Sequence, residues 1–544
     1  MEGKKVLIIG AGIASVQSAL DLAEAGNEVY FLERPPGFGL ETADEASFSS
    51  KWEEAKSNEN IQIITNWVLD KVRKENGNFQ VKIKKIAPRI IEEKCNDCKE
   101  CIKVCPISLG DDYNEGLSLR TAIDSFNIRT KSYNIIKERP VCEETCPVHL
   151  DIRGYIGLIA DGKFKEALDL IKERLPFPAT IGRVCPHPCE EKCNRGKKDE
   201  APRIRDLKRF VADFENQRQT GVISPELENE GKRVAIVGAG PAGLTCAHDL
   251  ALKGYRVTVF EKFPVSGGML SVGIPKYRLP REILNGEIED IERLGVEIKS
   301  NAPIGDDLSI DDLFNQGFEA VFIAIGAHVD QKARMEGEEA KGVVPGVNFL
   351  RDLNLGKEVK VENRIAIIGG GNVAMDAARS SLRLGAGEVS ILYRRSREEM
   401  PASDEEIEAA LEEGIKIEYL VAPLGAVTNN GAVSGIKCIR MELGEADASG
   451  RRRPIPIEGS EFEIELDMII PAIGQKPDLS FLPEDDTLEV TKWGTIAADL
   501  DSCETSREGV YAGGDCVTGP GIAIEAIAAG QKAALSIDEY LKNR

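Results

Sequence analysis

Nine of the thirteen cysteines in this 544-residue chain fall between residues 95 and 193. The first four are spaced C-x2-C-x2-C-x3-C and are followed by Pro106. This spacing is typical of ferredoxin segments that wrap thiolates around a [4Fe–4S] cluster, whereas zinc sites usually show two separated pairs. We therefore predict iron–sulfur ligation. The predicted ligands in this segment are Cys95, Cys98, Cys101 and Cys105.

A second cysteine group reads C-x3-C-P and then C-x3-C-x3-C. In a long chain, clustered cysteines indicate metal ligation more than a disulfide framework. The predicted ligands are Cys142, Cys146, Cys185, Cys189 and Cys193. Nine cysteines allow two all-cysteine [4Fe–4S] clusters with one thiol to spare, or three clusters if other ligands help. We predict two clusters and keep three as the alternative.

A glycine turn occurs three times between an apolar strand and an amphipathic helix, in residues 6–33, 234–261 and 365–395. Such strand–helix–strand units build parallel sheets, so the predicted class is α/β. A GxGxxG turn lets a phosphate approach backbone N–H groups at the positive end of the helix. Alone the motif is weak, but the strand before it and the helix after it strengthen the prediction.

The second copy predicts an FAD site. Its turn has all three glycines, and Glu261 ends the second strand, where it can accept a hydrogen bond from a ribose hydroxyl. Two later segments, AVFIAIGA (320–327) and VYAGGDC (510–516), supply the remaining strands of a flavin fold, and Asp515 is placed to hold the ribityl chain. The residues predicted to bind FAD are Gly238, Gly240, Pro241, Ala242, Gly243, Glu261, Lys262, Gly267, Gly268, Met269, Gly326, Gly514, Asp515, Gly521 and Ala523.

The third copy predicts a nicotinamide nucleotide site. Its second strand ends in two arginines rather than an acid, which suits a 2′-phosphate and favours NADP(H) over NAD(H). The alternative is that both arginines are merely exposed to solvent. The residues predicted to bind this nucleotide are Gly369, Gly371, Asn372, Val373, Ala374, Arg394 and Arg395.

The first copy is a weaker nucleotide site. It has Gly10, Gly12 and Ser15 in the turn and Glu33 at the strand end. Nothing between it and the cysteines resembles the later strands of a flavin fold. We therefore favour a half-Rossmann scaffold without its own flavin, with a second nucleotide as the alternative.

Length and composition frame these motifs. A chain of 544 residues with 29% charged residues predicts several globular domains. The net charge of −22 disfavours nucleic acid and anionic membranes as partners. No apolar run is long enough to span a membrane, and the apolar N-terminal run leads into a glycine turn, so we expect a cytoplasmic protein without membrane insertion.

The predicted organisation is two interleaved Rossmann-like domains preceded by a helical Fe–S domain and an N-terminal half-Rossmann and ferredoxin-like segment. The predicted limits are 1–90 for the half-Rossmann segment, 91–110 for the cysteine run, 111–218 for the helical [4Fe–4S] domain, 233–346 with 478–544 for the FAD-binding domain, and 347–477 for the NAD(P)H-binding domain.

Residues 135–544 resemble the glutamate synthase small subunit family, on CEETCPVHLDIRGYI, PFPATIGRVCPHPCEEKCNRG and SGGMLSVGIPKYRLP. That family includes the NADPH-binding large subunit of NADH-dependent ferredoxin:NADP oxidoreductase and the flavin half of dihydropyrimidine dehydrogenase. The resemblance implies that YRRSREEMPAS (393–403) contacts the NADPH adenosine and that VYAGGDC binds FAD. Residues 1–110 resemble the start of the heterodisulfide reductase flavin subunit instead.

One departure from the family concerns the clusters. The family usually has a C-x2-C pair shortly before Cys142, and this chain has none there. The resemblance then leaves the first family cluster with Cys142 and Cys193 alone. It assigns Cys146, Cys185 and Cys189 to the second cluster, whose fourth ligand is often not cysteine. The 95–105 run is one source of the missing thiolates.

The expected activity is hydride exchange between NADP(H) and FAD, followed by one-electron transfer through [4Fe–4S] clusters to a ferredoxin or a catalytic subunit of a larger complex. No catalytic acid or base is assigned. The alternatives are a flavin-based electron-bifurcating subunit and an assembly and relay subunit without turnover of its own. A disulfide reductase is disfavoured, because no cysteine pair follows Glu261.

Overall fold

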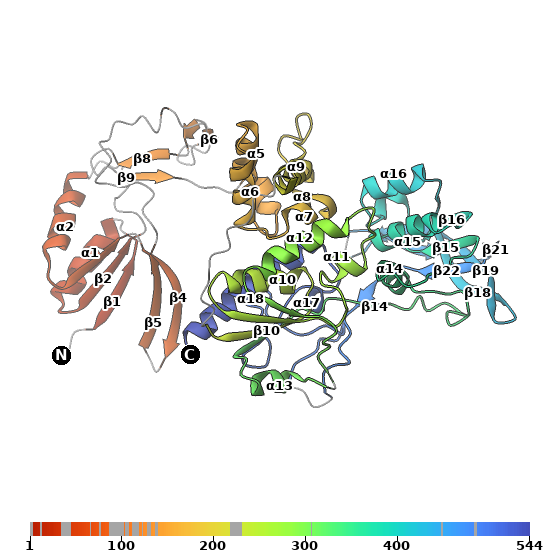
Figure 1. The fold of residues 1–544 in the computed structure, drawn as a ribbon. Coiled ribbons are helices and arrows are strands. Elements are labelled where there is room, and N and C mark those ends of the chain that lie inside the picture. The colour runs from red at the N-terminus through yellow and green to blue at the C-terminus, as the bar shows by residue number, and fades with distance from the viewer. Residues whose placement is uncertain are drawn as a thin grey trace. The chain divides into compact units, whose positions relative to one another are not determined.

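The computed structural model of this chain divides into two compact units, residues 1–139 and 140–544, and each is described by itself (Figure 1). The described residues are 4–10, 13–33, 45–65, 67–75, 78–85, 103, 108–110, 119–121, 123–127, 132–135, 140–217, 231–305, 307–447, 450–483 and 487–544. The predicted ligands Cys95, Cys98, Cys101 and Cys105, and Gly12 of the first turn, lie outside them.

The first unit contains a small parallel sheet. Its strands follow the order β1 (Lys5–Ile9), β2 (Glu28–Glu33) and β3 (Ile61–Thr65). Helices α1 (Ile13–Glu24) and α2 (Glu45–Ser57) connect them. Val16, Ala19 and Phe31 are fully buried between sheet and helices, because the apolar residues of α1 recur on one face.

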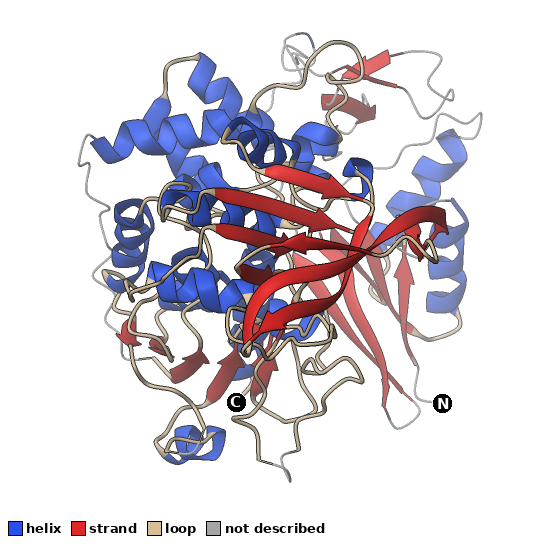
Figure 2. Cartoon of the chain, turned by 90° about the vertical axis from the view of Figure 1, so that its right-hand side faces the viewer, coloured by secondary structure: helices blue, strands red, loops and turns tan. Residues whose placement is uncertain are grey.

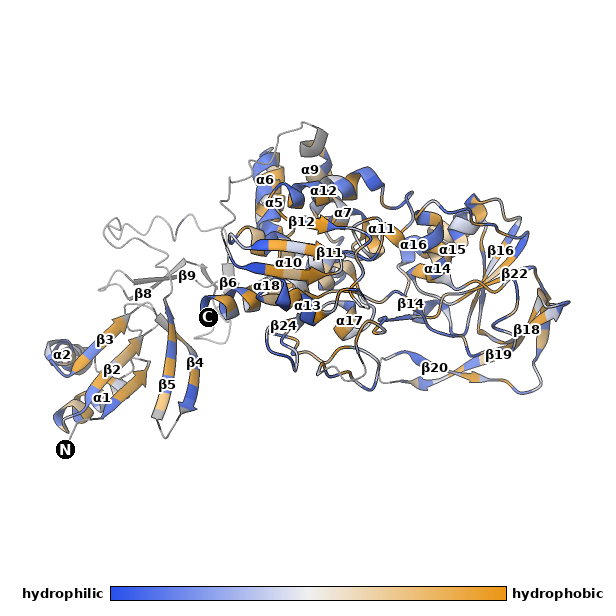
Figure 3. Cartoon of the chain, turned by 60° about the horizontal axis from the view of Figure 1, so that its bottom comes forward, coloured by the Kyte–Doolittle hydropathy of each residue, from blue (hydrophilic) through white to orange (hydrophobic). Residues whose placement is uncertain are grey.

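Three antiparallel pairs of strands complete the described part of this unit. They are β4 (Trp67–Glu75) with β5 (Asn78–Lys85), β6 (Ser108–Gly110) with β7 (Leu119–Thr121), and β8 (Ile123–Asn127) with β9 (Ser132–Ile135). Figure 3 shows along β5 the alternation of polar and apolar residues that is typical of strands. The sequence prediction began a helical domain at residue 111, whereas the described residues from 108 to 135 are mainly strands, and α4 begins only at Val141.

The second unit begins with a group of helices. They are α4 (Val141–Thr145), α5 (Ile152–Ala160), α6 (Phe164–Lys172), α7 (Pro178–Val184), α8 (Pro188–Glu191) and α9 (Ile204–Gln217). Asp151 caps α5 by accepting a hydrogen bond from Gly154 N at 2.9 Å. Buried Tyr155 ties α5 to α9 through its hydroxyl, which donates to Ile204 O at 3.1 Å.

A five-stranded parallel sheet follows. Its strand order is β12 (Glu297–Lys299), β11 (Arg256–Phe260), β10 (Arg233–Val237), β13 (Ala320–Ile323) and β24 (Val510–Ala512). On β10, Val234 and Ile236 enter one core while Ala235 and Val237 enter another, so both faces are covered. The helices of this domain are α10 (Pro241–Ala251), α11 (Met269–Val272), α12 (Arg281–Glu292), α13 (Ile310–Asn315), α17 (Asp515–Thr518) and α18 (Ala523–Lys542).

A second Rossmann-like domain is inserted between β13 and β24. Its parallel sheet has the order β17 (Lys416–Tyr419), β16 (Glu388–Tyr393), β15 (Arg364–Ile368) and β22 (Met468–Pro471). Its helices are α14 (Gly346–Asn354), α15 (Asn372–Arg383) and α16 (Asp404–Glu412), with the short 3-10 helix η3 (Arg397–Glu399). The chain enters and leaves through β14 (Val329–Asp330) and β23 (Gln475–Lys476), which pair antiparallel.

An antiparallel sheet is appended to the inserted domain. Its strands are β18 (Val421–Asn429), β19 (Ala432–Ala446), β20 (Arg452–Pro456) and β21 (Phe462–Glu465). Figure 2 shows its long twisted strands in front. The predicted α/β class with two interleaved Rossmann-like domains is confirmed by this topology, while the predicted residue limits of the domains stay predictions.

Within the parts of the chain that the structure describes, no helix combines the length and the apolar composition that crossing a membrane requires.

Candidate functional site

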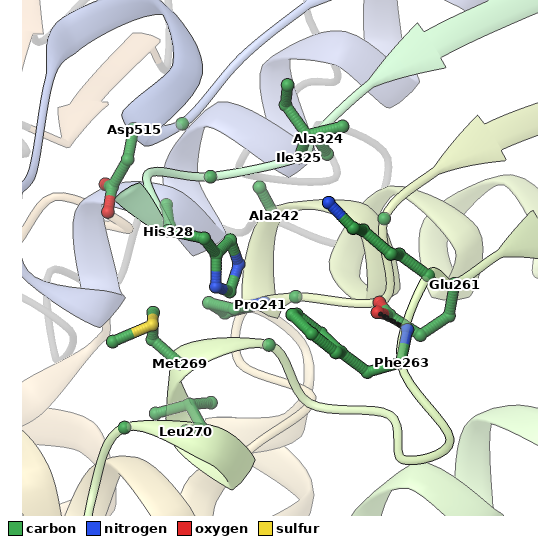
Figure 4. Close-up of a pocket in the computed structure, with 18 of the residues that line it drawn as sticks. Pro241, Ala242, Glu261, Phe263, Met269, Leu270, Ala324, Ile325, His328 and Asp515 are labelled. Atoms are coloured by element: carbon green, nitrogen blue, oxygen red, sulfur yellow. Dashed lines mark hydrogen bonds between the residues drawn. The ribbon is translucent and has the colours of Figure 1, made fainter. Parts of the chain in front are cut away.

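A cavity of about 1010 Å³ opens at the carboxyl ends of β10, β11, β13 and β24. This is the edge at which doubly wound sheets bind dinucleotides. The residues around it come from the 238–242 turn, the loop after Glu261, residues 302–305 and 324–328, and the segments 513–515 and 521–526. Figure 4 shows Glu261 and Asp515 on opposite sides of it.

The glycine turn after β10 presents bare backbone to this cavity. Gly238 has φ +105°, and a Cβ there would lie 2.6 Å from Ala324 O. A Cβ on Gly268 would lie 2.8 Å from the Cα of Gly240, so the 267–268 loop touches the turn directly. Gly240 is the N-cap of α10 and Pro241 is its first residue. The open N–H groups of this helix end suit a pyrophosphate.

Glu261 is held at the end of β11 by two backbone donors. Its Oε2 accepts from Ala239 N and its Oε1 from Phe263 N, each at 2.8 Å. The side chain is 4% exposed, and this burial raises its pKa. Each carboxylate oxygen keeps a lone pair for a ribose hydroxyl. Beside it, Lys262 Nζ lies 3.2 Å from Asp478.

Asp515 begins α17 on the opposite side of the cavity. Its Oδ1 accepts from Gly521 N at 3.2 Å. Burial raises the pKa of Asp515 to about 6, and the charge of Glu525 adds to this. Gly514 before it has φ +75°, a conformation that favours glycine. An acid at each end of the cavity fits the two sugar-like parts of an extended FAD, so the residues present fit that cofactor.

Most of the residues predicted for FAD line the cavity. Those that do are Gly238, Gly240, Pro241, Ala242, Glu261, Lys262, Gly268, Met269, Gly326, Gly514, Asp515, Gly521 and Ala523. Gly243 instead packs beneath the turn, where its Cβ would lie 2.0 Å from Gly238 O. Gly267 donates its N–H to Ala239 O at 2.7 Å and holds the second loop against the turn.

The sequence interpretation missed several cavity residues, of which His328 is the most informative. Its Nδ1 is buried and has no hydrogen-bond partner in the described structure, and its ring centroid lies 5.5 Å from that of Phe263. Burial lowers the pKa of His328 to about 4, and the charges of Arg351 and Lys262 lower it further, so the ring is neutral at pH 7. Its place directly after AIGA was the available signal.

The third glycine turn opens onto the same cavity. Gly369 has φ +138°, and a Cβ there would lie 2.2 Å from Ala472 O. Gly371 is the N-cap of α15, and Ala374 is fully buried in that helix. Asn372 and Val373, in its first turn, line the cavity with the FAD residues. One cavity therefore serves both nucleotide turns.

The two arginines after β16 differ in their surroundings. Arg395 is 6% exposed; its Nε donates to Arg452 O at 2.7 Å, and its Nη2 lies 2.8 Å from Asp447. Its guanidinium thus holds the 447–452 connection of the antiparallel sheet. Arg394 is exposed at the strand end. Of the two predicted phosphate ligands, Arg394 is the one presented to solvent.

Ion pairs join the inserted domain to its neighbours. Arg278, from the flavin domain, lies 2.7 Å from Asp376 of α15 and 2.9 Å from Glu406 of α16. Arg205, from the helical segment, lies 2.9 Å from Glu405 of α16. Because Asp376 is buried and the Arg278 side chain is only 13% exposed, separating them would leave unpaired charges in a low-dielectric place. These contacts fix the relative position of the two nucleotide turns.

The second cysteine group falls into two sets. Cys146, Cys185 and Cys189 are buried and close enough that their charges couple. Burial raises the pKa of Cys189 to about 12, with Cys185 and Cys146 adding to the shift. Burial also raises the pKa of Cys142, and the charge of Cys193 adds to that shift. These sets match the split that the family resemblance implies.

The donor chemistry of the three-cysteine set fits an iron–sulfur cluster. It is all sulfur, buried and next to the Lys208 ammonium, whose charge favours the thiolates of Cys185 and Cys189. Among the residues that the structure describes, no group of three His, Cys, Asp or Glu side chains is arranged so that it could hold a metal ion as it stands. Val184 and Pro186, on either side of Cys185, line the nucleotide cavity, so the cysteine set borders it.

The first glycine turn has a smaller setting. Gly10 has φ +90° and donates its N–H to Leu32 O at 2.9 Å. Ser15 lies in α1, and Glu33 is the last residue of β2. Within the described part of the first unit, the parallel sheet has three strands. A half-Rossmann scaffold without flavin stays a prediction.

The family models that match this chain cover all three copies of the glycine turn. A model for pyridine nucleotide-disulphide oxidoreductases matches residues 232–530, more than half of the chain. Another model of that description matches residues 5–87. A model described as dihydropyrimidine dehydrogenase domain II, 4Fe-4S cluster, matches residues 135–220. FAD, a nicotinamide nucleotide and [4Fe–4S] are accordingly the cofactors of this chain, as predicted, and the cluster count stays a prediction.

Two characterised relatives and one solved structure illustrate the match. NADP(+)-dependent formate dehydrogenase subunit beta of Moorella thermoacetica is 49% identical over 74% of this chain and 60% of its own length. The glutamate synthase [NADPH] small chain of Escherichia coli is 37% identical over 74% of this chain and 89% of its own. FprA of Mycobacterium tuberculosis, solved with NADPH, shares the fold at 19% identity and a TM-score of 0.50, over 58% of this chain and 85% of its own.

The chain spans between 60% and 64% of the length of four curated relatives that it matches. It covers most of the glutamate synthase small chain, and the predicted resemblance to that family is confirmed. The chain belongs to the pyridine nucleotide-disulphide oxidoreductase family, in the group that includes the small chain of NADPH-dependent glutamate synthase.

Proposed function

We propose that this chain is the electron-transfer subunit of an NADPH-dependent iron–sulfur flavoprotein, which exchanges hydride with NADP(H) and delivers single electrons to a ferredoxin or a partner catalytic subunit. One observation carries the proposal. The cavity that the FAD turn opens onto is also lined by Asn372 of the nicotinamide turn and by both neighbours of Cys185. The three groups that the reaction needs therefore have their binding residues around one space.

When bound, FAD would supply the conversion between the two-electron hydride chemistry of NADP(H) and the one-electron chemistry of [4Fe–4S] clusters, with one proton released per hydride. The chain's own residues position these groups. Glu261 accepts from the adenosine ribose, the α10 N-terminus faces the pyrophosphate, and Asp515 holds the ribityl side. Apolar walls such as Met269 and Ile325 exclude water from the reacting faces.

A preference for NADPH over NADH rests on Arg394. It is exposed at the end of β16, where the 2′-phosphate of a bound nucleotide lies in this fold. An arginine pairs with phosphate through a charge-assisted, bidentate hydrogen bond. Arg395 is engaged with Asp447 and contributes by shaping the loop.

The partner is proposed to be a redox subunit of a larger assembly. Relatives of the chain are described as a beta subunit of formate dehydrogenase and as a small chain of glutamate synthase. A disulfide reductase, the activity in the family's name, is disfavoured here. None of the cavity-lining residues in the described structure is a cysteine, and that chemistry needs a cysteine pair beside the flavin.

The test uses anaerobically purified, cluster-loaded protein with a viologen dye as acceptor. We expect NADPH to reduce the dye with a higher kcat/KM than NADH. We also expect about eight iron atoms per chain, the content of two [4Fe–4S] clusters. If neither nucleotide reduces the dye while FAD and iron are bound, the proposed function is wrong.

A further inference from the structure

The first residue of helix α12 donates hydrogen bonds to residues that line the flavin cavity. Arg281, the first residue of the helix, donates to the carbonyl oxygens of Ile274 at 2.6 Å, Leu279 at 3.0 Å and Leu270 at 3.1 Å. Leu270 and Ile274 line the cavity, in the loop that follows Gly268. Arg281 therefore fixes the flavin-side loop to the beginning of α12.

Further along α12, the side chain of Glu287 contacts a different element, helix α7. Its side chain is buried, and its two carboxylate oxygens accept from consecutive backbone N–H groups, Ala179 N at 2.6 Å and Thr180 N at 3.0 Å. These two residues are in the first turn of α7. Backbone donors at the start of a helix have no partner within it, so an acid there is stabilising.

Helix α7 leads directly to the cysteine set. It spans Pro178–Val184, and Cys185 is its C-cap. It is tightly seated on its other side as well, because a Cβ on Gly182 would lie 2.8 Å from the Cα of Arg209 in α9. A helix of seven residues clamped in this way transmits a shift at its start to Cys185 at its end.

The cap of α7 comes from outside its own segment. Phe177 occupies the N-cap position and makes no side-chain hydrogen bond. A Ser, Thr, Asp or Asn at that position would stabilise the helix locally. Instead the acceptor belongs to the flavin domain, more than a hundred positions away in sequence. The contact therefore ties α7 to the flavin domain as well as capping the helix.

We propose that Glu287 is a positioning residue that holds the cysteine-bearing helix α7 against the flavin cavity, with α12 as the spacer between them. Glu287 lies six positions after Arg281, about 9 Å along a helix. The contact thereby sets the separation between the flavin-side loop and Cys185. This inference rests on the proposed function, in which electrons pass from FAD to the cluster at Cys146, Cys185 and Cys189.

The test compares Glu287→Gln with the wild-type holoenzyme. The amide keeps the size of the carboxyl group but presents an NH2 group to one of the two backbone donors, so one hydrogen bond is lost. Glu289→Gln is the matched control, because Glu289 lies on the exposed side of the same helix and its carboxylate pairs with Arg293 in the described structure. Measurements are made near pH 8, above the pKa of about 7 to which burial raises Glu287.

Two readouts are followed. After mixing with NADPH in a stopped-flow instrument, flavin reduction should keep its wild-type rate in Glu287→Gln, while cluster reduction slows severalfold, because α7 loses one of the two hydrogen bonds that hold it to the flavin domain. Hydrogen exchange of the 178–185 amides, followed by mass spectrometry, should accelerate in Glu287→Gln and stay unchanged in Glu289→Gln.

The outcomes separate the two ideas. Wild-type protein whose flavin is reduced without cluster reduction would overturn the proposed function. Wild-type transfer together with unchanged transfer in Glu287→Gln would overturn the positioning role. If Glu287→Gln does not fold, Glu287→Asp takes its place, since the shorter acid keeps the charge and reaches one donor less well; an unchanged transfer rate in that variant is equally contrary to the proposal.

Discussion

The first and second glycine turns begin alike and end in different settings. Both follow an apolar strand and both hold a glycine at positive φ; Glu33 is the last residue of β2, and Glu261 directly follows the last residue of β11. The second turn lies in a five-stranded parallel sheet, where β13 and β24 bring Gly326 and Asp515 to the cavity. The described sheet around the first turn has three strands. A flavin site is thus built by late strands as much as by the turn.

The sharpest way to break this comparison is a matched pair of glycine substitutions. Gly238→Ala should abolish FAD binding, because the added Cβ lies 2.6 Å from Ala324 O and forces the turn apart. Gly10→Ala has comparable strain from positive φ, but no atom of the described residues lies within 4 Å of its Cβ. It should leave the FAD content unchanged. Flavin absorbance per chain measures both, and FAD loss in Gly10→Ala alone would reverse the assignment.

A second prediction concerns Asp515, which has no counterpart in the described sheet of the first unit. Its raised folded pKa of about 6 means that the folded protein holds a proton that the unfolded chain, near its ordinary value, has released. Stability from this group is therefore full at low pH and falls as pH rises from about 4 to about 6, by about 3 kcal/mol at most. Urea unfolding of the FAD-free protein at several pH values should show wild type losing stability relative to Asp515→Asn as pH rises, and a wild type that gains stability relative to Asp515→Asn over that range would contradict the prediction.

The two strand-end acids offer a smaller contrast. Glu261→Gln should weaken FAD binding by about tenfold, because a charged acceptor is lost and an NH2 group faces a backbone donor. Glu33→Gln should leave the FAD dissociation constant as in wild type. Titration of flavin-free protein with FAD, followed by flavin fluorescence, measures both constants. Equal weakening in the two variants would show that both turns contribute to FAD binding.

The smallest expected effect separates the two arginines of the third turn. Arg394→Gln should lower kcat/KM for NADPH by about fivefold and leave that for NADH unchanged, because only NADPH offers a phosphate there. Arg395→Gln should lower thermal stability instead, since it loses Asp447 and Arg452 O. Steady-state kinetics with both nucleotides measures these effects. A selective loss of NADPH activity in Arg395→Gln would show that Arg395, and not Arg394, binds the phosphate.

The sequence predicted the parts of this site that a motif encodes and missed those that depend on tertiary packing. Glu261 and Asp515 follow strands at fixed positions, so their place at the sheet edge was predictable. The burial of Arg395 was not, because it depends on Asp447, which lies 52 positions further along the chain, directly after strand β19 of the antiparallel sheet. Glu287 resembles any acid on an amphipathic helix, and its partner lies more than a hundred residues away.

The strands between residues 108 and 135 were also missed. Their apolar residues alternate over runs of only three to five residues, too short to distinguish from a frayed helix by period alone. The helical set from α4 to α9 was easier, since the apolar spacing in α6 and α9 persists over two turns or more.

The most direct test of the account adds NADPH anaerobically to cluster-loaded wild-type, Gly10→Ala and Gly238→Ala proteins and records the electron paramagnetic resonance spectrum of each. Electrons from NADPH are proposed to reach the clusters only through FAD at the second turn. We therefore expect a reduced [4Fe–4S] signal in wild type and in Gly10→Ala, and none in Gly238→Ala. A full cluster signal in Gly238→Ala, or its absence in flavin-loaded wild type, would contradict that claim.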